Sequence, residues 1–305
     1  MLGIVVIGSL NADFVINAPR FPAPGETVAG RAFNIYPGGK GANQAFAIAR
    51  LGGKVSMIGQ VGNDAQGDFL TQNLASAGAD MSHVHRDPKV STGVAIITIN
   101  AEGQNQIVVI PGANGSFGEE RLHRSRDPIT SAGLVLLQLE IPLPTVAAAA
   151  RLASQAGACV MLDPAPAQEL PDELLACVDY LTPNETELAI LTHTEPRTFT
   201  RTEAARQARI LLKRGAKKVI VKLGAQGALL VEADRELFWP ALPVMAVDTT
   251  AAGDAFNAAF AFALASGKSE REAGFFATAA AAHSVTQSGA QPSMPSRAQV
   301  DQLLK

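Results

Sequence analysis

Short apolar runs alternate along this chain with longer segments of helical composition, and this alternation limits the fold more than any other feature. The apolar runs lie at 2–7, 54–61, 134–139, 159–162 and 218–223. Runs this short, and mostly rich in β-branched residues, predict strands that are buried on both faces. Strands separated by helices predict a mostly parallel sheet covered on both sides, so we expect a three-layer α/β/α fold.

Five polar residues and one glycine stand at or just past the ends of the expected strands, where open α/β sheets bind their ligands. They are Glu140, Asp163, Asn184, Glu187, Gly224 and Asp248. We expect a further strand in the apolar segment 243–247, which would place Asp248 at its end. The carboxyl ends of parallel strands lie at one edge of the sheet, so these residues indicate one site and not scattered helix caps.

The segment 248–257, DTTAAGDAFN, opens an Ala- and Phe-rich helix expected to run to about residue 265. The first amides of a helix have no partners inside it, so Ala251, Ala252, Gly253 and Asp254 are candidates for an anion site. Asp254 would place a carboxylate beside that site, where it could take a proton from a hydroxyl. Thr and Asp are also common N-capping residues, and on this segment alone ordinary capping explains the residues equally well.

A glycine-rich segment, PGGKGANQA at 37–45, precedes another expected helix at 42–51. Gly38 and Gly39 allow close backbone approach, and Lys40 and Asn43 add polar groups near the helix start. The spacing differs from that of a Walker A loop, because Gly41 follows Lys40 where Ser or Thr is required. A loop with a helix cap is the alternative interpretation.

Asn11 and Asp13 are separated by one residue and would point to the same face of an extended segment. Together they offer an amide and a carboxylate to a polyhydroxylated ligand. A solvated strand edge or turn accounts for them equally well. Alternating residues at 93–100 and 106–110 predict a β-hairpin around 101–104, and 27–36 has mixed strand character.

Composition excludes several classes of function. The 305 residues carry a net charge of −3, which gives no basic footprint for nucleic acid or an anionic membrane. The two cysteines, Cys159 and Cys177, form no metal or disulfide pattern. The apolar start is too short for a signal peptide, and no apolar run reaches membrane-spanning length. We therefore expect a cytoplasmic protein.

Seven motifs of this chain resemble those of the ribokinase-like (phosphofructokinase-B) carbohydrate kinases, in the same order and over essentially the whole chain. They are NAD at 11–13, GGKGANQA at 38–45, QLE at 138–140, DPAPA at 163–167, PNETE at 183–187, DTTAAGDAFN at 248–257 and GAQPS at 289–293. The resemblance implies a single kinase domain over residues 1–305, with a small β lid formed from about 12–36 and 91–110. It also implies a homodimer formed through that lid.

The resemblance further implies that ATP and Mg²⁺ are used to phosphorylate the 5-hydroxyl of D-ribose. Asp254 would be the general base, and the Ala251–Asp254 amides the anion hole. The residues implied for the sugar are Asn11, Asp13, Gly39, Lys40, Asn43 and Glu140. Those implied for the nucleotide and magnesium region are Asn184, Glu187, Lys222, Gly224, Gly227, Gly253 and Thr278. A potassium or other monovalent-cation site is implied at Asp248, Thr250, Ser284, Gln287, Gly289 and Ser293.

Alternatives stay open at this point. The sugar could be 2-deoxyribose or another sugar that the family phosphorylates. A sugar- or nucleotide-sensing protein without turnover is the other alternative, and the intact Asp254 and Gly253 argue against it. The chain also departs from the usual pattern: Asp163 replaces Asn, Lys222 replaces Thr, and Thr278 and His283 are unusual near the adenine. Lys222 could pair with a phosphate or be a solvated strand end, and the two interpretations are equally supported.

Overall fold

The computed structural model describes residues 2–305 and is built on a nine-stranded sheet. The strand order is β13-β12-β11-β10-β9-β8-β1-β4-β5, and every pair from β5 to β11 is parallel, whereas β12 and β13 add antiparallel. The strands are β1 (Ile4–Ile7), β4 (Val55–Gly62), β5 (Asp80–Asp87), β8 (Leu134–Leu137), β9 (Cys159–Leu162), β10 (Tyr180–Leu181), β11 (Lys218–Lys222), β12 (Gly227–Val231) and β13 (Glu236–Pro240). The predicted α/β class is confirmed.

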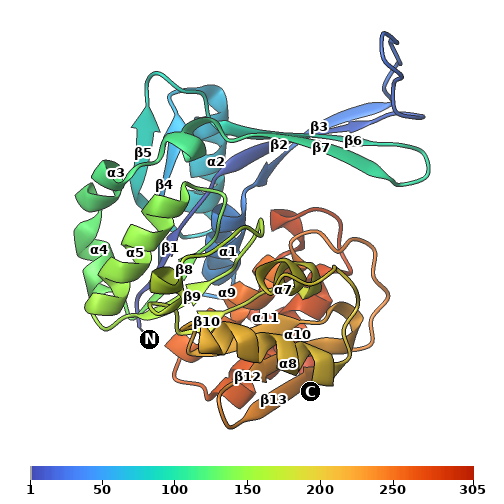
Figure 1. The fold of residues 1–305 in the computed structure, drawn as a ribbon. Helices are drawn as coiled ribbons and strands as arrows, with labels where there is room; N and C mark the ends of the chain where they lie inside the picture. Colours follow the sequence, from blue (N-terminus) through green and yellow to red (C-terminus); the bar gives the residue numbers. More distant parts are fainter. Residues whose placement is uncertain (1) are drawn as a thin grey trace.

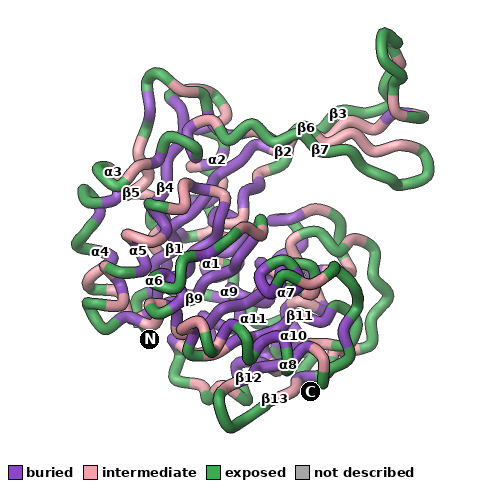
Figure 2. Tube along the Cα trace, viewed as in Figure 1, coloured by how far each residue is buried: buried purple, intermediate pink, exposed green. Residues whose placement is uncertain are grey.

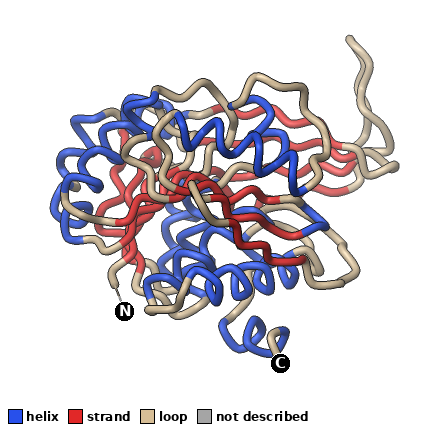
Figure 3. The backbone as a smooth tube through the Cα atoms, turned by 60° about the horizontal axis from the view of Figure 1, so that its bottom comes forward, coloured by secondary structure: helices blue, strands red, loops and turns tan. Residues whose placement is uncertain are grey.

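Helices cover both faces of this sheet, and Figure 3 shows the strands between them. One side carries α1 (Lys40–Arg50), α2 (Ala65–Ser76), α9 (Ala252–Ala265), α10 (Glu270–Ser284) and α11 (Arg297–Leu303). The other carries α3 (Glu119–Arg124), α4 (Arg126–Ser131), α5 (Leu143–Gln155), α6 (Asp172–Leu175), α7 (Glu185–Leu191) and α8 (Arg201–Lys213). Residues 2–305 also include three short 3₁₀ turns: η1 (Gly112–Ser116), η2 (Gly224–Gln226) and η3 (Gln291–Ser293).

Strand β1 shows why the layers form. Its four residues are all buried, and because successive side chains of a strand point to opposite faces, they enter two cores. Ile4 and Val6 pack with α1, α9 and α10, whereas Val5 and Ile7 pack with α5 and the helices beside it. Figure 2 shows this continuous buried centre in the body of the molecule. No helix among residues 2–305 is long and apolar enough to cross a membrane.

A second, four-stranded sheet projects from the body, as Figure 1 shows. Its order is β3-β2-β6-β7, with β2 (Asn11–Asn17) and β6 (Gly93–Ile99) parallel and β3 (Ala32–Gly38) and β7 (Asn105–Ile110) antiparallel at the edges. The edge strands β3 and β7 of this lid sheet are largely exposed, whereas the central strands β2 and β6 are mostly half-buried (Figure 2). Asn11 and Asp13 lie on one face, and the register places Phe14 on the other.

One expected strand is absent. Residues 243–247 form no strand, and the last strand, β13, ends earlier at Pro240. The segment is an exposed loop in which the side chain of Met245 is 84% exposed and that of Val247 is 62% exposed. Pro243 lacks the N–H that a central strand donates, so an apolar run was not enough to define a strand here. Asp248 therefore follows a loop, which the Val247 amide ties to the Val285 carbonyl at 2.7 Å.

Candidate active site

The first turn of α9 is open. Its N-cap residue, Ala251, adopts a left-handed conformation with φ 58°, and no side chain accepts a hydrogen bond there. A non-glycine residue with positive φ is uncommon and carries strain. Asp248 caps the Thr250 amide instead, at 2.9 Å. Ordinary side-chain capping therefore does not explain this segment. The Ala252 amide donates to the Thr249 carbonyl at 3.3 Å, and the amides of Ala251, Gly253 and Asp254 stay available to an anion.

Asp254 lies inside this turn and is only 4% exposed. Two side-chain amides from α1 hold its carboxylate: Asn43 Nδ2 donates to Oδ2 and Gln44 Nε2 donates to Oδ1, both at 3.0 Å. Burial raises the pKa of Asp254 above its ordinary value; the charge of Lys40 opposes this rise, and the charge of Asp163 adds to it. A raised pKa strengthens a carboxylate as a proton acceptor.

Lys40 is the cation at the centre of the cluster. Burial alone would lower the pKa of Lys40, but the charges of Asp254, Asp163, Glu140 and Glu187 outweigh it and raise the pKa above its ordinary value. These four carboxylates come from four separate strand or helix ends, so the structure brings together the sugar-side and nucleotide-side residues expected from the sequence. Lys40 stays charged and offsets part of their repulsion.

Glu140 is anchored at the start of α1. Its Oε2 accepts the Lys40 backbone amide at 2.9 Å and the Ser9 hydroxyl at 2.5 Å. Gln138 precedes it by two residues and donates from Nε2 to Gln44 Oε1 at 2.7 Å. These two side chains therefore fix the loop after β8 to the first turns of α1.

Asn11 and Asp13 reach the same region from β2. Asn114 Nδ2 donates to Asn11 Oδ1 at 2.8 Å and so orients its amide. The Asp13 carboxylate lies directly over Gly38, where a Cβ atom would come within 2.1 Å of Oδ2. Gly39 has φ 88°, and a Cβ there would lie 2.7 Å from the Asn11 amide nitrogen, so this turn requires glycine. Burial raises the pKa of Asp13 to about 7, and the charge of Glu140 adds to the rise.

Lys222 lies at the carboxyl end of β11 and is not a solvated strand end. Its side chain is 12% exposed and its ammonium lies 2.8 Å from Asp163 Oδ1, which is itself 3% exposed. A Cβ atom at Gly253 would lie 3.3 Å from Lys222 Nζ. Lys222 therefore places its charge beside the open first turn of α9.

Asn184 and Glu187 form a capping box at the start of α7. Each accepts from the other's backbone amide, at 2.7 and 2.8 Å, and Asn184 Nδ2 also donates to Glu187 Oε1 at 2.8 Å. Burial raises the pKa of Glu187, the charge of Lys222 opposes the rise, and that of Asp163 adds to it. Among residues 2–305 no group of three His, Cys, Asp or Glu side chains is arranged to hold a metal ion.

Three of the expected nucleotide residues have local roles in the fold. Gly224 has φ 52° and begins the 3₁₀ turn η2, with open space where a Cβ would be. Gly227 has φ 114° and contacts β13 so closely that a Cβ would come within 2.0 Å of the Trp239 carbonyl oxygen. Thr278 is buried in α10, where its hydroxyl donates to the Gly274 carbonyl at 2.8 Å. Only Gly224 faces open space.

The expected monovalent-cation residues gather where the 248–251 turn meets the C-terminal loop. Asp248 Oδ2 accepts the Gly289 amide at 2.8 Å, and Oδ1 accepts the Thr250 amide. Burial acts to raise the pKa of Asp248, but these hydrogen bonds outweigh it and hold the pKa below its ordinary value. The hydroxyls of Ser284 and Ser293 donate to Ala281 and Ala290 carbonyls, and Gln287 Nε2 lies 3.4 Å from the Thr286 hydroxyl.

Several site residues were not identified from the sequence. They are Ser9, Gln44, Asn114, Gln138 and Gln291, and Asp163 was placed at a strand end without a role. Gln291 Nε2 donates to Asn43 Oδ1 at 3.2 Å and so ties the C-terminal loop to α1. Gln138 lies in the QLE motif with Glu140, just past the end of β8, a signal that could have found it. Asn114 acts on a residue 103 positions away and left no local signal.

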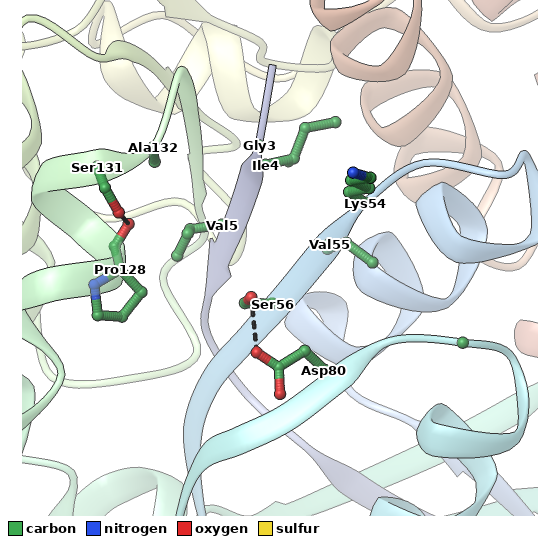
Figure 4. A pocket seen from close by; sticks show the side chains of 11 residues that line it. Gly3, Ile4, Val5, Lys54, Val55, Ser56, Asp80, Pro128, Ser131 and Ala132 are labelled. Carbon is green, nitrogen blue, oxygen red and sulfur yellow. Dashed lines mark hydrogen bonds between the residues drawn. The ribbon is translucent and has the colours of Figure 1, made fainter. Parts of the chain in front are cut away.

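A surface cavity of about 340 Å³, drawn in Figure 4, lies at the opposite end of the sheet from these residues. It is lined by residues at the amino ends of β1, β4 and β5, among them Ile4, Val55 and Asp80. Ser56 donates to Asp80 across it at 3.0 Å. The site residues described above follow the carboxyl ends of the strands, so this cavity is not part of that site.

Comparison with known proteins agrees with this geometry. Residues 1–297 match the family described as pfkB family carbohydrate kinase. The ribokinase of Haemophilus influenzae is 42% identical over 302 residues, 99% of this chain and 98% of its own. The deoxyribokinase of Salmonella typhimurium is 41% identical over 304 residues, 99% of each chain. The structure of Arabidopsis thaliana ribokinase complexed with ribose and ATP has a TM-score of 0.95 at 37% identity, covering 100% and 99% of the two chains.

The fold, the carboxylate at the open helix start and these matches define a sugar kinase, and the chain belongs to the pfkB family of carbohydrate kinases. Within that family its enzymatic class is that of a ribokinase-type phosphotransferase. Thermotoga maritima ribokinase, whose structure is 41% identical with a TM-score of 0.91, supports the same assignment.

Proposed function

We propose that this enzyme transfers the γ-phosphoryl group of ATP to the 5-hydroxyl of D-ribose. One observation carries the proposal: the buried Asp254 carboxylate lies inside the open first turn of α9, beside the sugar-side residues Lys40 and Asn43. A base next to the uncapped amides of a helix start suits transfer of a phosphoryl group to a hydroxyl. The Arabidopsis relative, complexed with ribose and ATP, supports both substrates.

The sugar would be held between β2 and the start of α1. Asn11 and Asp13 offer an amide and a carboxylate from the lid, Gly39 and Lys40 line the turn, and Glu140 accepts from the opposite side. A carboxylate can accept hydrogen bonds from two hydroxyls, which suits a polyol. The same residues fix the sugar so that one hydroxyl faces Asp254.

Catalysis would then need a single proton transfer from the sugar. Asp254 takes the proton of the 5-hydroxyl as the oxygen of that hydroxyl bonds to the γ-phosphorus. In the same step the bond from the γ-phosphorus to the oxygen that bridges it to the β-phosphate breaks, and ADP leaves. The amides of Ala251 to Asp254 stabilise the charge on the transferring group, and Lys222 adds a cation beside Gly253.

Mg²⁺ fits this site as a partner of the nucleotide and not as an ion held in a protein cage. Mg²⁺ is commonly bound through one or two carboxylates together with substrate phosphates and water. Glu187 is the carboxylate that would meet it, and Asn184 keeps Glu187 in place. The metal would supply charge neutralisation on the phosphates; Gly224, Gly227 and Thr278 are proposed for the nucleotide side.

A potassium ion is proposed for the junction of the 248–251 turn with the C-terminal loop. Asp248 is ionised and anchored by amides from both segments, and Thr250, Ser284, Gln287, Gly289 and Ser293 surround the junction as oxygen donors. Such an ion would hold the strained Ala251 turn in its open form. Equal kcat in potassium, sodium and choline buffers would rule it out.

The lid sheet is proposed to pair with a second copy. Its face opposite Asp13 exposes apolar side chains, with Phe33 58% and Val108 61% exposed. A contiguous exposed apolar surface of this kind marks an interaction site. A homodimer joined through the two lids would cover it.

An ADP-release assay with D-ribose, 2-deoxy-D-ribose, fructose and pseudouridine tests the substrate. We expect the highest kcat/KM with D-ribose. The 41% identity to the deoxyribokinase of Salmonella typhimurium favours 2-deoxy-D-ribose as the second candidate. A kcat/KM for 2-deoxy-D-ribose above that for D-ribose would reverse the assignment.

A further inference from the structure

The ion pair between Lys222 and Asp163 is unusual in its burial. The two side chains are 12% and 3% exposed, less than those of any other ion pair among residues 2–305. Burying two charges costs desolvation that their attraction repays only in part, so such a pair is poor evidence of a stabilising purpose. The position of the Lys222–Asp163 pair beside the site gives a functional reason for its burial.

One end of the pair faces the phosphoryl-transfer centre. Lys222 Nζ lies 3.3 Å from the place of a Cβ atom on Gly253, in the first turn of α9. The Lys222 amide donates to the Pro183 carbonyl at 2.9 Å, and this fixes the backbone from which the side chain reaches across. The ammonium is thus held against the amides proposed to receive the transferring group.

The other end of the pair leads to the base. Asp163 Oδ2 accepts from Gln44 Nε2 at 3.3 Å, and the same nitrogen donates to Asp254 Oδ1 at 3.0 Å. Gln138 donates to Gln44 Oε1 at 2.7 Å and so fixes which end of the Gln44 amide faces the two carboxylates. Lys222, Asp163, Gln44 and Asp254 therefore form one continuous chain of contacts.

We infer that Asp163 is a positioning residue that joins the two chemical halves of the site. One of its oxygens holds the Lys222 ammonium at the α9 amides, and the other orients Gln44 and, through it, Asp254. The inference rests on the proposed kinase function. Lys222 neutralises charge on the transferring phosphoryl group and moves no proton, because the proton of the sugar hydroxyl passes to Asp254.

Three variants test the inference: Asp163→Asn, Lys222→Met and the double variant. The matched control is Lys217→Met, which removes a lysine from the opposite end of β11, where Lys217 pairs with Asp179 at 2.8 Å. Thermal melting establishes that each variant is folded. The neutral double variant leaves no buried charge unpaired, so it carries the test if a single variant does not fold.

Kinetics and ligand binding give separate readouts. We expect Lys222→Met to lower kcat by about 10²–10³-fold, the effect of removing one charge-stabilising donor. Asp163→Asn should lower kcat by about 10²-fold, because the Lys222 ammonium and the Asp254 carboxylate would be displaced from their working positions. The KM for D-ribose should change little, because Asp163 is not among the residues proposed to hold the sugar. The double variant should lose more than Lys222→Met, because the contact of Asp163 with Gln44 is changed as well, but less than the product of the two single losses, because both substitutions also act on one ammonium.

Calorimetric titration with ADP and with ADP–aluminium fluoride, in the presence of Mg²⁺ and D-ribose, needs no turnover. Lys222→Met and Asp163→Asn should weaken ADP–aluminium fluoride more than ADP, whereas Lys217→Met should weaken neither. Asp163→Asn should also move the acid limb of kcat/KM to lower pH, because it removes the negative charge that faces Asp254 and leaves Lys40 as its charged neighbour.

Two outcomes overturn the inference in distinguishable ways. If the wild type turns over and the site variants match Lys217→Met in kcat and in ADP–aluminium fluoride affinity, the pair has no role in transfer. If the wild type turns over none of the sugars and does not bind ADP, the proposed function fails and the inference fails with it.

Discussion

Asn43 Nδ2 donates a hydrogen bond to Asp254 Oδ2 at 3.0 Å, across 211 positions of the chain. The side-chain oxygen of Asn43, Oδ1, is also engaged, because it accepts a hydrogen bond from Gln291 Nε2. Asn43 therefore orients the proposed base in addition to any contact with sugar. The starts of α1 and α9 face each other through this one side chain.

Replacing Asn43 should consequently affect two parameters. We expect Asn43→Ala to raise the KM for D-ribose and to lower kcat, because a buried carboxylate loses a donor at a cost of about 1–3 kcal/mol. Asn73→Ala is a suitable control, since Asn73 bonds Gln291 in the same network without contacting Asp254. Steady-state kinetics on both variants checks this. An unchanged KM in Asn43→Ala would remove the sugar contact from the account.

The pH profile should report the raised pKa of Asp254. Its charged neighbours are Lys40, which lowers the pKa, and Asp163, which raises it, while burial raises it most. The base must be ionised, so kcat/KM should fall as pH falls through a value above the 3.8 of an ordinary Asp. A pH titration of kcat/KM measures this limb. An acid limb at or below 3.8 would mean that Asp254 is not the titrating base.

Asp13 should make the free enzyme's stability depend on pH. The pKa of Asp13 is raised to about 7 in the folded state. Its stabilising contribution to the free energy of unfolding is therefore fully present below pH 3.8 and is lost as the pH rises through about 7. Asp13→Asn removes this loss and should stabilise the sugar-free protein at pH 8, by at most about 4 kcal/mol, but not at pH 4. Denaturant unfolding at both pH values tests it. Asp234→Asn, in an exposed turn, should show no such difference; equal stabilisation by Asp13→Asn at both pH values would contradict the prediction.

The lid face offers a test of assembly. Phe14 pairs with Ile35 and Ile96, and Ile96 pairs with Val108, so these side chains share the face opposite Asp13. Val108→Glu should place a charge in the proposed contact and shift a dimer toward monomer in light scattering. Ile210→Glu changes an isolated exposed residue of α8 and should not. A wild type that is monomeric at micromolar concentration would exclude the lid-to-lid dimer.

The fold could be predicted because its signals are local. The apolar runs of β1, β4, β8, β9 and β11 are buried on both faces, and this is what a run without alternation indicates. The expected strand at 243–247 was wrong because apolarity does not by itself provide a sheet partner. Strand pairing is a tertiary property, and within residues 2–305 the loop after Pro240 pairs with no strand.

The residues of the site could be predicted only where a motif carries them. Asp254, Lys40 and Glu140 lie in recognisable stretches, and the structure brings them together. Gln44 lies inside the GGKGANQA motif, but its contacts with Asp163 and Asp254 arise only in the fold, and Asn114 orients Asn11 from a segment without a motif. Lys222 could not be assigned from sequence because its partner, Asp163, lies 59 positions away and only the fold joins them.

Asp254→Asn is the most direct test of Asp254 as the general base. The variant keeps the shape of the side chain and removes a buried carboxylate. Because the pKa of Asp254 is raised in the folded state, its ionisation at pH 8 destabilises the fold, so the variant should have a melting temperature at pH 8 at least equal to that of the wild type. It should still bind D-ribose and ATP, but lose at least about 10²–10⁴-fold in kcat, the scale of general-base catalysis. A folded Asp254→Asn enzyme with near wild-type kcat would contradict the assignment of Asp254 as the base.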